Sequence, residues 1–417
     1  MNAIRIGICA LLAFAVVALG GVQPWGIASL EIGAAGLFLL WGAASFRRRE
    51  ANVRWNWIYL PVIGLIAVGF AQKVLGVPVY PYASQVELLK WVAYLGFSFL
   101  AVETFRSAAQ LRRLAWFLAG LGFLVALFAI VQHYSFNGKL YWFIPLPPAA
   151  EPFGPFVNRD HFAGFVELTA PMGLAMLLDD GRRGEKAALL TLFTVVPIAA
   201  LVLSGSRGGI VAFALAALGL VLLSRLQNSG MRQLLAFTSL VIVASGFIFW
   251  LGAGGTIQRF ETLTPSGLSR GQRVALDRDT WRIFSDHPWI GTGLGTLETV
   301  FPRYETDYDG LVVDHAHNDY LELLAETGVI GGFLGLVFIV VLFRRGFGNL
   351  NSRERRASRA FYAGSLAGCG ALLVHSFVDF NLHIPANALL FLLLASMATA
   401  DTNKPAAVRN SILVAGS

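Results

Sequence analysis

The feature that most constrains the fold of this chain is a series of apolar stretches, each of about 20 residues, the length of a helix that crosses the bilayer core. Only 14% of the 417 residues are charged, against about 25% in a soluble domain. The sequence therefore predicts an all-α, polytopic membrane protein with about 12 transmembrane helices, forming a single membrane-embedded domain over residues 1–417. The predicted spans are residues 4–20, 26–45, 57–72, 86–104, 110–133, 161–179, 187–203, 208–224, 233–252, 328–343, 358–378 and 384–400.

The basic residues are distributed unequally between the two sides of the predicted membrane domain. If the N-terminus is cytoplasmic, 21 of the 32 Lys and Arg residues fall on the cytoplasmic side. The short connections on the opposite side carry only Lys73, Lys139, Arg159 and Arg207. The positive-inside rule then predicts that both termini are cytoplasmic. Because topology accounts for the net charge of +7, we expect no nucleic-acid partner.

One outer connection, residues 253–327, is much longer than the others, and connections of that length are commonly functional. We expect it to contain short helices. A helix over residues 273–286 would place Arg273 and Asp277 on one face and Arg282 on the opposite face. Arg273 could then bind an anion, or it could belong to a solvated helix face.

The polar run from Asp314 to Gly331 leads directly from this connection into the span at 328–343. A helix starting near His317 would place Tyr320 on the same face as His317. His317 suits the role of a general base, since imidazole works near neutral pH. The alternative is a polar residue that only starts a helix at the membrane surface.

Four glycines follow along the same predicted helix and form two overlapping G-x-x-x-G pairs. This spacing is typical of close packing against a neighbouring span. We therefore expect the helix to be held rigidly within the bundle. The glycines are Gly328, Gly331, Gly332 and Gly335.

His315 and His317 could also be metal ligands, because their spacing places both on one face of a strand. On a helix the same spacing points them apart. No other histidine or cysteine cluster has a recognised ligand spacing, and Cys9 and Cys369 both lie inside apolar stretches. The sequence therefore predicts no metal site, and no motif indicates a cofactor.

Polar groups also stand at the outer ends of other spans. Arg207 lies in a turn of small residues, Ser204–Gly209, where it could bind phosphate oxygens or extend to the membrane surface. Arg159 and His161 begin the span at 161–179, and Asp379 follows the span at 358–378. These three could line one outer cavity, or could serve only as interfacial hydrogen-bonding groups.

Together these residues resemble the O-antigen ligases and related polysaccharide polymerases. His317-Asn318, nine further residues and then Gly328-x-x-Gly331 are similar to that family's histidine motif. The turn that contains Arg207 and the order of Arg273, Pro288, Gly291 and Gly293 also resemble the family core. The resemblance covers residues 155–400 in order, and the first 150 residues match only in topology.

The resemblance implies an inverting, metal-independent glycosyltransferase in the bacterial inner membrane, with its active site facing the periplasm and part of that site in the large periplasmic loop at 253–327. The implied donor is a glycan on undecaprenyl pyrophosphate, and the acceptor is a sugar hydroxyl of lipid A-core or of another glycan. His317 would be the catalytic base, and Arg207 and Arg273 would bind pyrophosphate. The other residues that could line the site are Arg159, His161, Arg282, His315, Asn318, Tyr320 and Asp379.

Other functions stay open on the sequence. A polymerase of O-antigen or exopolysaccharide would share the same motifs, and only its acceptor would differ. A transporter for a lipid or solute would need ionisable residues deep in the spans, for which Glu31, Lys90 and Glu167 are the nearest candidates. A membrane scaffold would not need His317 and the arginines on one face.

Overall fold

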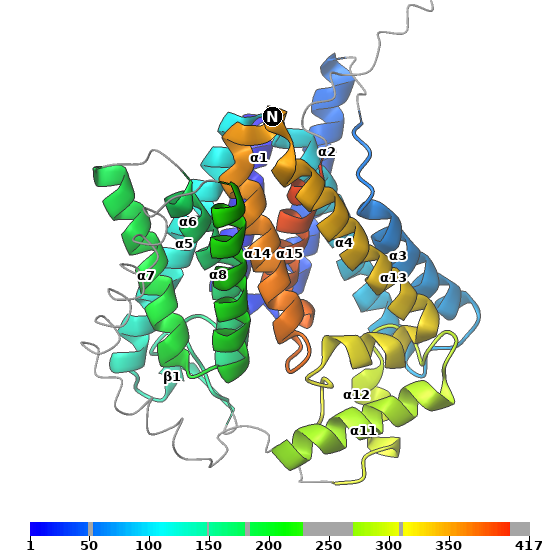
Figure 1. Ribbon diagram of the computed structural model, residues 1–417. Helices are drawn as coiled ribbons and strands as arrows, with labels where there is room; N and C mark the ends of the chain where they lie inside the picture. The colour runs from blue at the N-terminus through cyan, green and yellow to red at the C-terminus, as the bar shows by residue number, and fades with distance from the viewer. Residues whose placement is uncertain (49–52, 148–149, 180–183, 228–269, 308–311, 401–417) are drawn as a thin grey trace, which may run out of the picture.

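The computed structural model describes residues 1–48, 53–147, 150–179, 184–227, 270–307 and 312–400. Most of this part of the chain is helical (Figure 1). Its only paired strands, among the described residues, are β1 (Lys139–Leu140) and β2 (Ile144–Pro145), which form a small antiparallel hairpin. The helices of the bundle are α1 (Asn2–Val17), α2 (Pro24–Arg48), α3 (Tyr59–Val74), α4 (Pro81–Thr104), α5 (Ala108–Tyr134), α6 (Arg159–Leu178), α7 (Glu185–Ser204), α8 (Arg207–Gln227), α13 (Asp319–Asn351), α14 (Arg359–His375) and α15 (Pro385–Thr399).

Six of these helices, α2, α4, α5, α6, α7 and α13, are long and apolar enough to cross a membrane. Four shorter apolar helices, α1, α3, α8 and α15, accompany them. The predicted all-α membrane class is therefore confirmed. The predicted number of twelve spans is not established, and the stretch at 233–252 lies outside the described residues.

The centre of the bundle is formed by α6 and α15. Nearly every side chain of α6 from His161 onward is buried, and so is every side chain of α15. Both helices are apolar around their whole circumference, which is the pattern of a helix enclosed by others. Helix α14 packs along α6 and α15, whereas α2 lies at the periphery with much of its apolar surface exposed.

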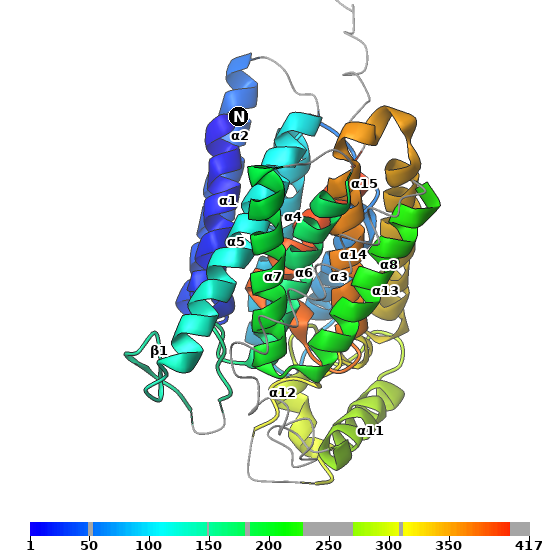
Figure 2. The ribbon, with the colours of Figure 1, turned by 60° about the vertical axis from the view of Figure 1, so that its left-hand side comes forward.

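A second, smaller layer caps one end of the bundle (Figures 1 and 2). It is formed by α11 (Arg270–Asp286), α12 (Leu297–Val300) and the short 3₁₀ turn η2 (Phe301–Arg303). These elements share their own small core, which includes Leu276, Ile283 and Phe301. The connections between α5 and α6, between α7 and α8, and between α14 and α15 lie at the same end of the bundle as this layer. The alternation of spans predicts that these three connections share one side.

Helix α13 changes direction sharply at Gly328, whose backbone has φ 65° and ψ −165°. Before the break, the helix runs across the end of the bundle, and after it the helix rises beside α3 (Figure 1). The freed amide of Val329 donates to the carbonyl of Pro288 at 2.8 Å. A Cβ at position 328 would lie 2.3 Å from the carbonyl carbon of Trp289. Only glycine fits this crossing of two backbones.

The expected packing of the four glycines against a neighbouring span is wrong. A Cβ at Gly331 would meet the side chain of Thr327, and one at Gly332 would meet Leu324. At Gly335 the nearest side chain is Leu323. These glycines lie against the preceding segment of α13 itself, because the helix folds back at its break.

Candidate functional site

His317 lies in the extended segment just before α13, not on the helix. Its φ of 50° is unusual for a residue other than glycine and indicates local backbone strain. Its Nδ1 is 3.3 Å from Oδ1 of Asp379, and its ring meets the edge of Phe380 at 4.8 Å. The His317 side chain is 23% exposed, so a ligand can reach it.

Asp379 is a buried carboxylate that orients His317. Burial acts to raise the pKa of Asp379, but the hydrogen bond from His317 and the nearby ring of His161 hold that pKa below its usual range. Its other oxygen accepts a hydrogen bond from Asn381 at 3.0 Å. A charged carboxylate facing Nδ1 favours the tautomer with the proton on Nδ1 and a free lone pair on Nε2.

The polar network continues from Asp379 into the bundle. Asn381 Nδ2 is 3.3 Å from His375 Nδ1, which in turn lies 2.8 Å from Oε1 of Glu167. Both members of this His–Glu pair are almost completely buried. Ionisable side chains buried inside the bundle are costly unless each has a partner. Here His375 and Glu167 are partners of each other.

The turn that carries Arg207 lies against this buried pair. A Cβ on Gly208 would be 2.8 Å from Nε2 of His375, and one on Gly209 would be 2.9 Å from Oε1 of Glu167. Small residues therefore let the start of α8 approach the network closely. Arg207 itself, the first residue of α8, is exposed.

Arg273 reaches the site from the opposite side, on α11. Asn318 caps α13 by accepting from the amides of Tyr320 and Leu321. Its side-chain amide lies 3.4 Å from Oδ1 of Asp277, one turn along α11 from Arg273. Burial raises the pKa of Asp277, although Asn318 and the Arg273 charge oppose this. The Nε of Arg273 is buried with no hydrogen-bond partner in the described part of the chain.

Arg282 lies away from this group. Its guanidinium is 3.3 Å from Asp279, and half of its side chain is exposed. The predicted separation of Arg282 from the Arg273–Asp277 face therefore holds, and Arg282 does not line the His317 site.

Three other predicted residues lie around the same end of the bundle. His161 is buried with its ring 4.7 Å from Phe380, and its Nε2 has no hydrogen-bond partner among the residues described. Arg159 pairs with Glu151 at 3.2 Å, beside a cavity of about 310 Å³ between the ends of α5, α6 and α7. Tyr320 donates to the carbonyl of Leu373 at 2.5 Å and stacks near Phe377.

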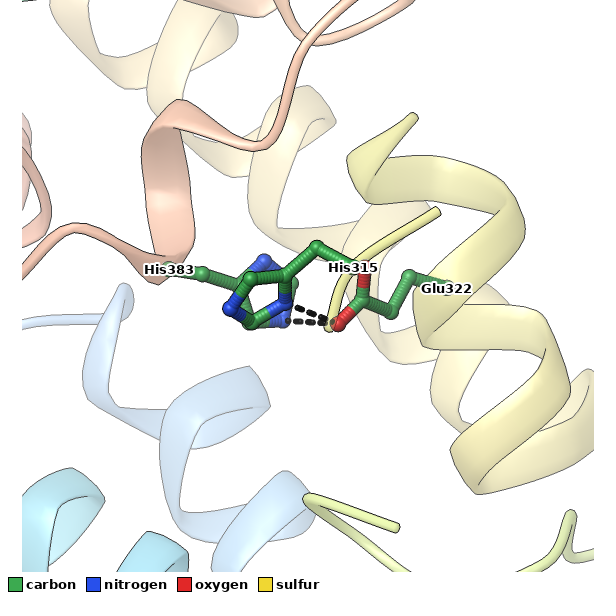
Figure 3. Close-up of side chains that lie close together, drawn as sticks. All are labelled: His315, Glu322 and His383. Atoms are coloured by element: carbon green, nitrogen blue, oxygen red, sulfur yellow. Dashed lines mark hydrogen bonds and ion pairs between the residues drawn. The ribbon is translucent and has the colours of Figure 1, made fainter. Parts of the chain in front are cut away.

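His315 belongs to a second cluster beside Phe380, on which its ring stacks with the ring centroids 4.3 Å apart. Its Nδ1 is 2.7 Å from Oε1 of Glu322, and Nε2 of His383 is 3.3 Å from that same oxygen (Figure 3). Burial acts to lower the pKa of both rings, but Glu322 raises that of His315. Glu322 and Asp319 together raise the pKa of His383 to about 10.

One sequence-based expectation is corrected here. His315 and His317 do not point apart on a helix, since both precede α13 and both contact Phe380. The sequence has no histidine or cysteine cluster at a recognised ligand spacing, but the structure brings one potential ligand atom each of His315, Glu322 and His383 within 4.8 Å of one another. Glu322 and His383 were not identified from the sequence as partners of His315. His383 lies far from His315 along the chain, and the only sign of it was its position four residues after Asp379.

An apolar cavity of about 400 Å³ adjoins the polar cluster. It lies between α3, α4, α13, α14 and α15, and most of its lining side chains are aliphatic or aromatic. Tyr320, Asp319, His383 and Glu326 lie at its polar end. The cavity thus joins membrane-embedded apolar surface to the end of the bundle where His317 lies.

The fold and the site define a class: a helical membrane protein whose histidines, carboxylates and arginines gather where the bundle meets a capping layer. Residues 192–336 match the family model described as O-Antigen ligase. The match supports the O-antigen ligase-like family that the motifs indicated, and includes Arg207, Arg273 and His317. That family implies, in general, a membrane glycosyltransferase-like enzyme of polysaccharide biosynthesis that uses lipid-linked glycans and polysaccharide acceptors. No curated protein matches the chain.

Proposed function

We propose that this protein transfers a glycan from undecaprenyl pyrophosphate to a sugar hydroxyl, with inversion, at the periplasmic face of the bacterial inner membrane. The acceptor is the lipid A-core of lipopolysaccharide. The observation that carries the proposal is the His317–Asp379 pair, a strained, partly exposed imidazole oriented by a buried carboxylate. This is the arrangement of a positioned general base.

In the proposed reaction, Nε2 of His317 takes the proton of the acceptor hydroxyl. The acceptor oxygen forms a bond to the anomeric carbon of the donor sugar, on the face opposite the leaving group. The bond from that carbon to the pyrophosphate oxygen breaks, and undecaprenyl pyrophosphate leaves with the electron pair. Asp379 stabilises the positive charge that develops on the His317 ring.

The departing pyrophosphate gains negative charge, which cations must stabilise. Arg273 lies on α11 one turn from Asp277, which contacts Asn318, and Arg207 begins α8 where Gly208 approaches His375. The buried Nε of Arg273 has no partner among the described residues, which supports a role in binding the leaving group. Because guanidinium binds phosphate oxygens in a forked geometry, these residues suit the task, and the reacting atoms need no metal.

The donor carries a long hydrocarbon chain that remains in the bilayer. The apolar cavity beside Tyr320 offers that chain a place next to the polar cluster. A lipid in this cavity would present its pyrophosphate at the end of the bundle. This supports lateral entry of the donor from the membrane.

The test is reconstitution of the purified protein with undecaprenyl-pyrophosphate glycan, without ATP, and with either lipid A-core or a second donor glycan. Transfer to lipid A-core supports the proposal, and the product must be absent with His317→Ala. Elongation of the glycan alone would make the protein a polymerase instead. Movement of the donor across the bilayer with no new glycosidic bond would establish a transporter and overturn the proposal.

A further inference from the structure

We propose that His315, Glu322 and His383 form a zinc site that fixes the end of α13 to the turn before α15. The site has no role at the reacting atoms and does not depend on the proposed glycosyl transfer. Its three residues come from three segments: the irregular segment before α13, the first turn of α13, and the 3₁₀ turn η4 (Asn381–His383).

The ligand atoms converge on one point. The two imidazole rings lie 4.8 Å apart, and each turns a nitrogen toward the same oxygen of Glu322 (Figure 3). All three potential ligand atoms lie within 4.8 Å of one another. Two ligands of a tetrahedral zinc ion at 2.0–2.2 Å lie roughly 3.3 Å apart, so side-chain shifts of about 1 Å bring all three atoms into range.

Two imidazoles and one carboxylate are a recognised zinc ligand set, with a fourth position left for water. The rings of His315 and His383 are partly exposed, with 27% and 20% of their side chains accessible, so an ion can enter. Two imidazole nitrogens favour zinc over magnesium or calcium, which prefer oxygen ligands.

The surroundings hold the ligands as second-sphere partners hold them in metalloproteins. Nδ1 of His383 donates to Oδ1 of Asp319 at 2.8 Å, which leaves Nε2 free to coordinate. Asp319 is itself held by the hydroxyl of Ser376 at 2.6 Å and the amide of Leu382 at 3.2 Å.

The second oxygen of Glu322 accepts from the amide of Ala316 at 2.9 Å, which orients the first oxygen toward the rings. Asp319 and Glu322 together place two carboxylates at this buried point, and a divalent cation would balance both charges. An ordinary hydrogen-bonded cluster does not require a carboxylate at each nitrogen of one histidine, as Asp319 and Glu322 provide for His383.

The consequence lies in the neighbouring pair. His315 is two residues before His317, and His383 is four residues after Asp379. Phe380 contacts both His315 and His317. A metal ion joining three segments here would set the distance between His317 and Asp379 without touching either residue.

The test is zinc binding to the untagged, purified protein in detergent, measured by elemental analysis after equilibration with micromolar zinc. The expected result is one zinc per chain, with His383→Gln and Glu322→Gln binding none. His287→Gln is the matched control, since His287 is an exposed histidine of the capping layer, and it should keep the zinc. Asp319→Asn should weaken binding by roughly 10- to 100-fold, because it removes only the partner behind His383.

Cobalt provides a second measurement on the unaltered protein, should the variants fail to fold. Cobalt in a site of two nitrogens and one carboxylate should give the visible absorption bands of tetrahedral coordination, and zinc should displace them. An absence of bound zinc and of these bands in the folded wild-type protein would overturn the proposal. Zinc that survives both ligand substitutions would overturn it equally. Neither outcome bears on glycosyl transfer, which is measured separately.

Discussion

At the scale of single residues, the site depends on how side chains around Phe380 divide their tasks. Both His317 and His315 contact this ring, but His317 faces Asp379 and His315 faces Glu322. Two histidines with one residue between them thus have different partners. Their substitutions should have different consequences.

Replacing His317 with alanine should lower the rate of transfer by roughly 10²- to 10⁴-fold, the usual effect of losing a positioned acid–base group. Donor binding should be largely retained, because both arginines remain. Single-turnover kinetics together with donor-binding measurements separate the two effects. His315→Ala should be milder on the chemical step, and equal loss in both variants would contradict the division of tasks.

Asp379→Asn tests the positioning role. Asparagine keeps the size of the side chain but cannot hold the imidazolium charge, so kcat should fall by roughly 10²-fold or more while KM for the donor stays nearly constant. A rise in KM without a fall in kcat would instead place Asp379 in donor binding.

Arg273 and Arg282 form a matched pair on one helix. Arg273→Ala should cost about 10²- to 10³-fold in kcat if its guanidinium stabilises the leaving group. Arg282→Ala should change the rate little, since Arg282 is half exposed and pairs with Asp279. Parallel assays on membranes with equal protein content provide the comparison, and similar losses in both would point to a general effect on α11.

At the scale of elements, the break in α13 is what positions the site. The loop over residues 290–293 crosses this helix backbone to backbone, with the amides of Thr292 and Gly293 donating to Ala325 and Glu326 at 3.0 and 3.1 Å. Gln72 of α3 joins the same crossing, donating to the carbonyl of Glu326 at 2.7 Å and accepting from the amide of Leu294 at 3.0 Å. The apolar helix α3, the break in α13 and the capping layer are thereby joined at one point.

Gly328→Ala should disturb this crossing. Alanine is strained at a φ of 65°, and its Cβ would collide with the backbone of Trp289. We expect a loss of about 1–3 kcal/mol in the free energy of unfolding. Gly348→Ala, in the same helix with open space around it, is the control and should be neutral or slightly stabilising. Thermal unfolding in detergent measures both, and an unchanged Gly328→Ala would argue against a rigid crossing.

At the scale of the whole molecule, all candidate groups lie at one end of the bundle, and the proposed function requires that end to face the periplasm. A cysteine at Asp307, exposed in the capping layer, should react with a membrane-impermeant thiol reagent added outside the inner membrane. A cysteine at Ala357, exposed between α13 and α14, should react only after the membrane is opened. The reverse pattern would contradict both the orientation and the proposed substrate.

Much of the architecture could be predicted because it depends on residues that are neighbours in the sequence. Apolar stretches of sufficient length specify helices, and the polar run from Asp314 to Gly331 indicated a span at 328–343, which begins at the break in α13. Gly291 and Gly328 belong to the motifs that resemble the family core. At both positions the backbone of the loop before α12 meets the backbone of α13. Their partners could not be predicted, since a motif records that close approach is needed and not what approaches.

The sequence by itself determined the membrane class, the family resemblance, and three of the residues at the proposed site, Arg207, Arg273 and His317. These follow from composition, from the periodicity of apolar residues and from short motifs, all of which are properties of neighbouring positions. Only the tertiary structure decided the partners: Asp379 for His317, and Glu322 with His383 for His315. These contacts join residues up to 68 positions apart, His315 and His383, and they exist because α13, α14 and α15 pack so that their ends meet.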